Sequence, residues 1–188
     1  MNKIIKIHGC SGAGKTTFAR ALLDGSDSTY TIRNAAGKVE AYGCAFNAQD
    51  FSCVVLGSYE NNCGGMDTVS TAAEAMKLVA DYQKFNNVVH EGLLQSTYYG
   101  AMGTDSRQYG DSYIYAFLDT PLETCLERVV ARREAAGSQN KFNPQLTRDK
   151  FVTIDRLRLR LPAMGHRVVV LDHKSPPLPQ LLNLMRET

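Results

Sequence analysis

Apolar runs alternate with amphipathic stretches along almost the whole chain. Continuous runs of apolar and β-branched residues predict buried strands at 3–8, 87–90, 113–118 and 168–171. Periodic patterns with capping signals predict helices at 17–23, 68–85, 121–136, 144–161 and 178–186. For the helix at 121–136, Thr120 is the expected N-cap and Gly137 the expected C′ residue. Strands and helices that alternate in this way predict a doubly wound parallel α/β sheet with helices on both faces.

Three further strand-like runs lie between the first two predicted helices, at 30–32, 39–45 and 52–56. The turn-forming segment 34–37 (NAAG) separates the first two of these runs. Together they predict a hairpin or a small strand segment.

The length of 188 residues predicts one domain over 1–188, with any substrate elements inserted as loops. No apolar run approaches the roughly 20 residues that span a bilayer, and the N-terminal segment has no signal-peptide pattern. We therefore expect a cytoplasmic protein without membrane contact. The five cysteines are scattered and lack CxxC spacing, which predicts reduced thiols.

The segment between the first strand and the first helix carries a phosphate-binding motif. Gly9, Gly14, Lys15 and Thr16 match the pattern GxxxxGK[ST] of a P-loop. In this setting the loop amides and the helix N-terminus point together at phosphate groups. The motif predicts an ATP site formed by Gly9, Cys10, Ser11, Gly12, Ala13, Gly14, Lys15, Thr16 and Thr17.

Two side chains of the motif have distinct expected roles. Lys15 is expected to neutralise the β- and γ-phosphates, and the Thr16 hydroxyl is expected to ligate Mg²⁺. The alternative is a glycine-rich turn with a solvated lysine.

A P-loop indicates a nucleotide but leaves the reaction open, because kinases, GTPases, motor ATPases and ligases share it. The chain has no guanine-reading NKxD-type segment, and its nearest late-strand segment is 171–174 (LDHK). The strand at 88–91 (VVHE) ends in one acid, whereas helicase and transporter ATPases normally have two adjacent acids there. These features favour a small kinase.

Small P-loop kinases close an arginine-bearing helical lid over the transferred phosphate. Arg128 and Arg132 lie four residues apart on a predicted helix and share one face, with Arg133 beside them. We predict an arginine-rich lid over about 128–160, with Asp119 positioning its turn. The alternative is a solvated basic helix.

Two carboxylates are candidates for the acceptor side. Glu91 ends a predicted strand, where open α/β sheets bind ligands, and could hold Mg²⁺ through water or accept the proton of a substrate hydroxyl. Its alternative is an exposed loop acid. Asp67 is the second candidate, with helix N-capping as its alternative. The adjacent Gly64 and Gly65 indicate close backbone approach to a flat or bulky group.

Four segments carry a resemblance to a known family: GCSGAGKTT, LGSYENNCGGMDT, VVHEGLL and YAFLDTPLETCLERVVARR. Over nearly all its length the chain resembles the bacteriophage P-loop kinases that act on 5-hydroxymethyluracil in DNA. In that family ATP phosphorylates the hydroxyl of a modified pyrimidine already in DNA, an activation step towards hypermodified thymidines. The resemblance implies three sets of roles: ATP and Mg²⁺ at Lys15 and Thr16, the attacking hydroxyl at Glu91 or Asp67, and the lid at Arg128 and Arg132.

A DNA partner agrees with the distribution of charge. Between 128 and 167 ten Lys or Arg residues stand against three Asp or Glu, and phosphate neutralisation supplies most non-specific affinity for DNA. A base inside a duplex must also be flipped out or presented on a single strand. Candidate stacking rings, with core or interface packing as their alternative, are Tyr98, Tyr99, Tyr109 and Tyr113.

Two other functions stay open at this point. A kinase of free nucleosides or nucleotides differs from a DNA kinase in the size of its acceptor. A nucleotide-dependent switch would use the P-loop without phosphoryl transfer. The single-domain size, the predicted arginine lid and the missing guanine motif speak against the switch.

Overall fold

A computed structural model of the chain describes residues 2–60, 65–69, 71–92, 106–138 and 142–187. Within this part of the chain, seven strands form one sheet in the order β2-β3-β4-β5-β1-β6-β7. The strands are β1 (Ile4–His8), β2 (Ser28–Arg33), β3 (Val39–Phe46), β4 (Phe51–Leu56), β5 (Asn87–Glu91), β6 (Tyr113–Leu118) and β7 (Arg167–Leu171).

The sheet is parallel from β4 to β7 and antiparallel at its other edge. β4, β5, β1, β6 and β7 pair in parallel, as expected. β2 and β3 form an antiparallel hairpin, which confirms the hairpin predicted from the strand-like runs, and β3 also pairs antiparallel with β4. The reason is local, because a short turn can join only antiparallel neighbours. In that turn Asn34 Oδ1 accepts hydrogen bonds from the backbone N–H groups of Ala36 and Lys38.

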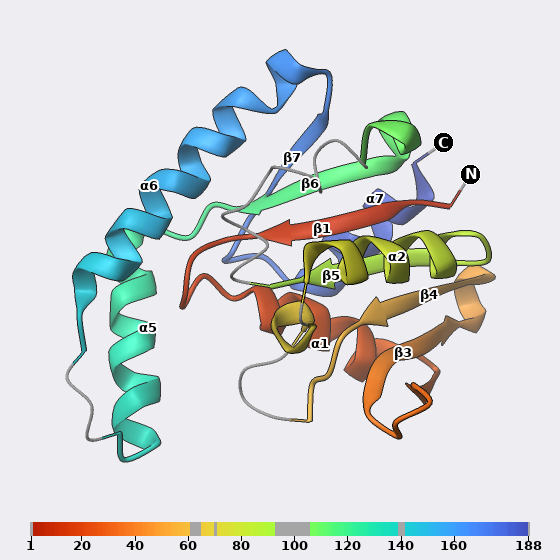
Figure 1. Cartoon of the computed structure of the whole chain (residues 1–188), viewed down its shortest axis with the longest axis horizontal. Helices are drawn as coiled ribbons and strands as arrows, with labels where there is room; N and C mark the ends of the chain where they lie inside the picture. Colours follow the sequence, from red (N-terminus) through yellow and green to blue (C-terminus); the bar gives the residue numbers. More distant parts are fainter. Residues whose placement is uncertain (1, 61–64, 70, 93–105, 139–141, 188) are drawn as a thin grey trace.

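Helices cover both faces of the sheet, which confirms the predicted α/β architecture (Figure 1). One core cluster joins the sheet to residues of α2, α5 and α6, and the other joins it to residues of α1 and α7. The helices are α1 (Lys15–Gly25), α2 (Ala72–Gln83), α5 (Leu122–Ala135), α6 (Pro144–Arg160) and α7 (Pro177–Arg186), with short 3₁₀ turns η1 (Asn47–Gln49), η2 (Met66–Thr68), η3 (Arg107–Ser112) and η4 (Pro162–Met164).

Two predicted helix starts differ from the structure. The helix expected from residue 68 begins at Ala72, because the side chain of Thr71 accepts the N–H of Glu74 and caps it. The helix expected to start with Thr120 as its cap instead follows Pro121. Thr120 is buried, and its hydroxyl donates to the carbonyl of Ala13 at 2.7 Å. A residue expected to serve a helix therefore holds the phosphate loop.

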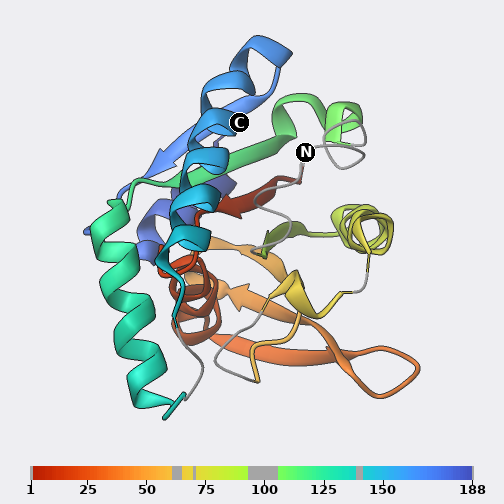
Figure 2. The same cartoon turned by 60° about the vertical axis from the view of Figure 1, so that its left-hand side comes forward.

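The helices α5 and α6 contact each other at the end of the sheet where β1 leads into α1 (Figures 1 and 2). They cover most of the region predicted as the lid. Within the described ranges, no helix combines the length and the apolar character needed to cross a membrane.

Candidate active site

The P-loop connects the carboxyl end of β1 to the start of α1, as the motif predicts. Gly12 has φ +82° and packs on the backbone of α5, where an added Cβ would lie 2.2 Å from the carbonyl oxygen of Cys125. A side chain at this position would collide with backbone, so only glycine fits. Together with the bond from Thr120 to Ala13, this contact sets the loop against the beginning of α5.

Lys15 is buried at the centre of the loop. Its Nζ donates to the carbonyl oxygens of Gly9 at 2.8 Å and Cys10 at 3.2 Å. Burial lowers the pKa of Lys15, and the nearby Glu91 carboxylate opposes this shift. The ammonium group is therefore held by the loop that would surround the phosphates of a nucleotide.

Thr16 and Glu91 come together from different elements. The pairing of β5 with β1 places Glu91 beside Ile7 at the end of the sheet, and Thr16 lies in the first turn of α1. The Thr16 hydroxyl donates to Glu91 Oε1 at 3.0 Å. Glu91 is 2% exposed, which contradicts its alternative as an exposed loop acid. Burial raises the pKa of Glu91 from 4.5 to about 7, against the opposing effects of Lys15 and the bond from Thr16.

This pair fits a magnesium ion. Mg²⁺ prefers hard oxygen ligands from one or two side chains together with nucleotide phosphates. The structure holds a hydroxyl and a carboxylate oxygen in contact, and the carboxylate is buried, so a cation beside it would offset the cost of its charge.

The loop before Asp67 approaches Glu91 closely. Gly65 has φ +75°, and an added Cβ would lie 2.6 Å from both the carbonyl oxygen and Oε1 of Glu91. The group that this glycine accommodates is Glu91 itself, while Gly64 lies outside the described residues. Asp67 sits in η2, so its alternative as cap of the next helix is wrong. Met66 is buried in the core and leaves Asp67 exposed beside the site.

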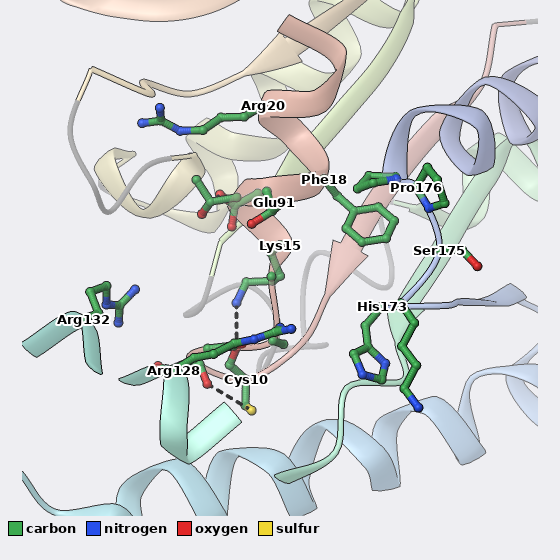
Figure 3. A pocket seen from close by; sticks show the side chains of 18 of the residues that line it. Cys10, Lys15, Phe18, Arg20, Glu91, Arg128, Arg132, His173, Ser175 and Pro176 are labelled. Carbon is green, nitrogen blue, oxygen red and sulfur yellow. Dashed lines mark hydrogen bonds between the residues drawn. The ribbon is translucent and has the colours of Figure 1, made fainter. Parts of the chain in front are cut away.

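One cavity of about 660 Å³ collects most of the predicted site residues. Its lining includes the loop from Cys10 to Thr17, both candidate carboxylates and two lid arginines. Arg20 and Arg132 lie on one side of Lys15, and His173, Ser175 and Pro176 lie on the other (Figure 3). We call the side with Arg20 and Arg132 the acceptor end, and the side with His173, Ser175 and Pro176 the base end.

The predicted lid arginines both line this cavity from α5. Arg128 Nη1 donates to the carbonyl of Gly12 at 3.3 Å, and both side chains are exposed. Arg133, one residue further, does not line the cavity and contacts the ring of Phe142 instead. Arg128 and Arg132, which lie four residues apart on α5, are thus both brought to the cavity at the P-loop.

The base end is formed by the loop that follows β7. Asp119 Oδ1 lies 2.7 Å from His173 Nδ1 and accepts the backbone N–H of His173 at 2.8 Å. Asp119 therefore binds this loop, and the expectation that it positions the lid turn is wrong. Its strand β6 lies next to β7, so the two strand ends meet at one edge.

Two cavity residues on α1, Phe18 and Arg20, were missed from the sequence. The missed signal is helical spacing, since Arg20 lies four residues after Thr16 and shares its face of the helix.

Among the candidate stacking rings, Tyr113 is 1% exposed and packs in the core, so its alternative holds. Tyr109 stacks on Tyr113 with ring centroids 6.1 Å apart. Tyr98 and Tyr99 lie outside the described residues.

Comparison with known proteins identifies relatives. The family model described as 5-hmdU DNA kinase matches residues 1–170. The "5-hmdU DNA kinase" of Pseudomonas phage M6 is 33% identical over 174 residues, covering 88% of this chain and 89% of that protein. The protein of the same name from Pseudomonas phage PaMx11 is 30% identical over 175 residues, covering 90% of each.

The fold is that of a solved gluconokinase from Sinorhizobium meliloti 1021, with a TM-score of 0.50 at 13% identity over 98% of this chain and 89% of that one. This likeness establishes the kinase fold. The family match spans the P-loop, the strand that ends at Glu91 and both helices α5 and α6. The chain therefore belongs to the 5-hmdU DNA kinase family.

Proposed function

We propose that this chain transfers the γ-phosphoryl group of ATP to the hydroxymethyl group of 5-hydroxymethyluracil in DNA. The family and the two relatives carry the name 5-hmdU DNA kinase, and the chain has a kinase fold. The observation that carries the proposal is the hydrogen bond between Thr16 and Glu91 beside Lys15. One cavity thus contains a P-loop hydroxyl, the ammonium group of Lys15 and a buried carboxylate.

The donor nucleotide occupies the P-loop side of the cavity. The loop amides and the N-terminus of α1 surround its phosphates, and Lys15 neutralises the β- and γ-phosphates. His173, Ser175 and Pro176 bound the base end, where we place the adenine. Thr16 would hold Mg²⁺ directly and Glu91 would hold it through water, and the ion would supply charge neutralisation at the phosphates.

Glu91 is the candidate general base. Its carboxylate accepts the proton of the hydroxymethyl group while that oxygen forms a bond to the γ-phosphorus. The bond from the γ-phosphorus to the β,γ-bridging oxygen breaks, and ADP leaves with the electron pair. A pKa of about 7 suits this task, because a base works best when its pKa lies near the working pH.

Arg128 and Arg132 stabilise the charge on the transferred group. Both line the cavity from α5, and arginines that reach the phosphate oxygens lower the energy of such transition states. Asp67, which is exposed at the edge of the acceptor end, would orient the incoming hydroxyl.

Two alternatives are separated by one experiment. The purified chain is incubated with labelled ATP and Mg²⁺ and with either hydroxymethyluracil-containing DNA or the matching free nucleotide. We expect label in the DNA. Label confined to the free nucleotide would instead identify a nucleotide kinase. Tight nucleotide binding with no label in either acceptor would identify a switch.

Lys15→Ala tests the donor side in the same assay. Loss of the buried ammonium removes the charge that faces the phosphates, so transfer to every acceptor should fall to background. Circular dichroism should show an intact fold. Arg186→Gln serves as the control, since this exposed residue on α7 contacts Phe51 away from the cavity. Activity that survives Lys15→Ala would refute the P-loop role.

A further inference from the structure

Arg20 lies in the cavity without a role in the donor chemistry above. It follows Thr16 by one helical turn on the same face of α1. The cavity lining includes Arg20 together with Asp67, Glu91 and Arg132. Figure 3 shows Arg20 and Arg132 on the side of Lys15 that faces away from the His173 loop. A second positive side chain thus faces the acceptor end.

The position of Arg20 is set by the loop that follows β4. Its Nη2 donates to the backbone carbonyl of Tyr59 at 2.8 Å. Tyr59 is 5% exposed, and its backbone N–H donates to the hydroxyl of Tyr42 at 3.2 Å, so this loop segment is fixed against β3. The bond therefore orients the group within the cavity wall.

The sheet order separates Arg20 from the base end. Glu91 ends β5 on one side of β1, and the His173 loop follows β7 on the other side. The nucleotide phosphates are served at the centre by Lys15 and Arg128, which bond to the P-loop carbonyls. Arg20 is one turn of α1 beyond this centre, on the Glu91 side, where the acceptor hydroxyl must lie.

The acceptor end combines carboxylates with arginine side chains. Glu91 and Asp67 are suited to a hydroxyl group, whereas an uncharged alcohol offers no anion to match the charge of Arg20. Arginine binds phosphate through paired, charge-assisted hydrogen bonds. An acceptor that carries a hydroxyl and a phosphate a few ångströms apart would engage both sets. A nucleotide unit, free or within a DNA strand, has this composition.

We infer that Arg20 binds a phosphate group of the acceptor strand and thereby selects a nucleotide in DNA over a free nucleoside. The inference rests on the proposed function for the identity of the hydroxyl. It adds a specificity-determining residue on α1 that holds the strand while the base reaches Glu91.

The test compares wild type with Arg20→Gln, because glutamine keeps a polar amide but carries no charge. The acceptors are a single-stranded oligonucleotide with one 5-hydroxymethyluracil, the free hydroxymethyl nucleotide and the nucleoside. We expect the KM for the oligonucleotide to rise roughly 10- to 100-fold with kcat little changed, as for one lost charge-assisted contact. The nucleoside, which lacks phosphate, should show a much smaller change.

The arms also distinguish the source of the phosphate. A matching rise in KM for the free nucleotide would assign the contact to the nucleotide's own phosphate, and a rise confined to the oligonucleotide would assign it to the strand. Either result supports the inference. An unchanged KM for the oligonucleotide, or a loss confined to kcat, would overturn it.

A binding measurement separates this inference from the proposed reaction. Anisotropy of a labelled thymidine oligonucleotide reports phosphate binding without any transfer. If wild type phosphorylates no acceptor, weaker oligonucleotide binding by Arg20→Gln still supports the phosphate site, and equal binding refutes it. Arg20→Lys should retain part of the affinity because it keeps the charge. Arg186→Gln, which removes one charge away from the cavity, should match wild type in both assays.

Discussion

At the scale of single residues, the buried carboxylate of Glu91 dominates the chemistry. It is reached by the Thr16 hydroxyl, lies close to Lys15, and is bordered by Gly65, whose missing side chain makes room for it. Because burial raises its pKa to about 7, the group changes charge within the physiological range. The site therefore gains a deprotonated carboxylate as the pH rises through this range and loses it as the pH falls.

The activity should therefore follow the ionisation of Glu91. A general base acts in its deprotonated form, so kcat/KM for DNA should rise with pH and level off, with a midpoint near or below 7 because a Mg²⁺ ion beside the carboxylate favours its charged form. Glu91→Gln should lower kcat roughly 100- to 10,000-fold and remove this dependence. Steady-state kinetics between pH 5.5 and pH 8.5, at constant ionic strength, measure both effects.

Asp67→Asn is the matched control for this profile. Asp67 is the other carboxylate of the acceptor end, so its variant should keep the rise near pH 7 with a smaller loss of rate. A profile that flattens in Asp67→Asn and persists in Glu91→Gln would assign the base to Asp67.

At the scale of elements, the P-loop is held by the start of α5. Thr120 donates to the carbonyl of Ala13, and Gly12 packs against the carbonyl of Cys125. Arg128 of the same helix reaches back to Gly12. The phosphate loop and the arginine-bearing helix thus form one unit, so a change at their junction should affect nucleotide binding.

Thr120→Val tests this junction. Valine has nearly the same shape but no donor, so the buried carbonyl of Ala13 loses its partner at a cost of about 1–3 kcal/mol in unfolding free energy. The affinity for ATP should fall as well, since the loop is less well held. Urea unfolding and nucleotide titration measure the two effects.

Thr153→Val provides the control for that substitution. Its hydroxyl donates to the carbonyl of Asp149 on the exposed side of α6, so its loss should change stability by less than about 0.5 kcal/mol. Equal destabilisation by both variants would show that the bond from Thr120 has no special role.

At the scale of the whole molecule, the buried carboxyl group of Glu91 lowers the stability of the folded state. A carboxyl group whose pKa is higher in the folded state binds its proton more tightly there than in the unfolded chain. For Glu91 the pKa is raised from its ordinary value of 4.5 to about 7. Between these two pH values the folded state becomes less stable as pH rises. The cost is complete above pH 7.

Glu91→Gln should remove this cost. Without nucleotide or Mg²⁺, the variant should match wild type near pH 4.5 and exceed its unfolding free energy by up to about 3 kcal/mol at pH 8. Urea unfolding of both proteins across this range measures the difference. A gap that stays constant with pH would mean that the titration of Glu91 does not control stability.

Much of the fold and half of the site follow from sequence patterns. The buried strands, the helix that opens at Lys15 and the Schellman-type end of α5 at Gly137 lie where local signals place them. The P-loop residues could be identified because their spacing is local and their chemistry is strict. Arg128 and Arg132 could be paired because helical periodicity places them on one face.

Other assignments failed because their partners are distant in the chain. Thr120 looks like a helix cap until Ala13, more than a hundred residues earlier, accepts its hydroxyl. Asp119 looks like a lid residue until β7 brings His173 beside it. The antiparallel hairpin, by contrast, could be predicted, because the short turn at 34–37 can join only antiparallel neighbours.

The sequence by itself determined the alternating α/β plan, the phosphate-binding loop and the presence of a carboxylate at the end of β5, because each depends on residues close together in the chain. Only the tertiary structure decided which groups act together. Strand order places β5 and β7 on opposite sides of β1, which gives the cavity its two ends. Burial then decides the pKa of Glu91, and burial is a property of packing that no local pattern contains.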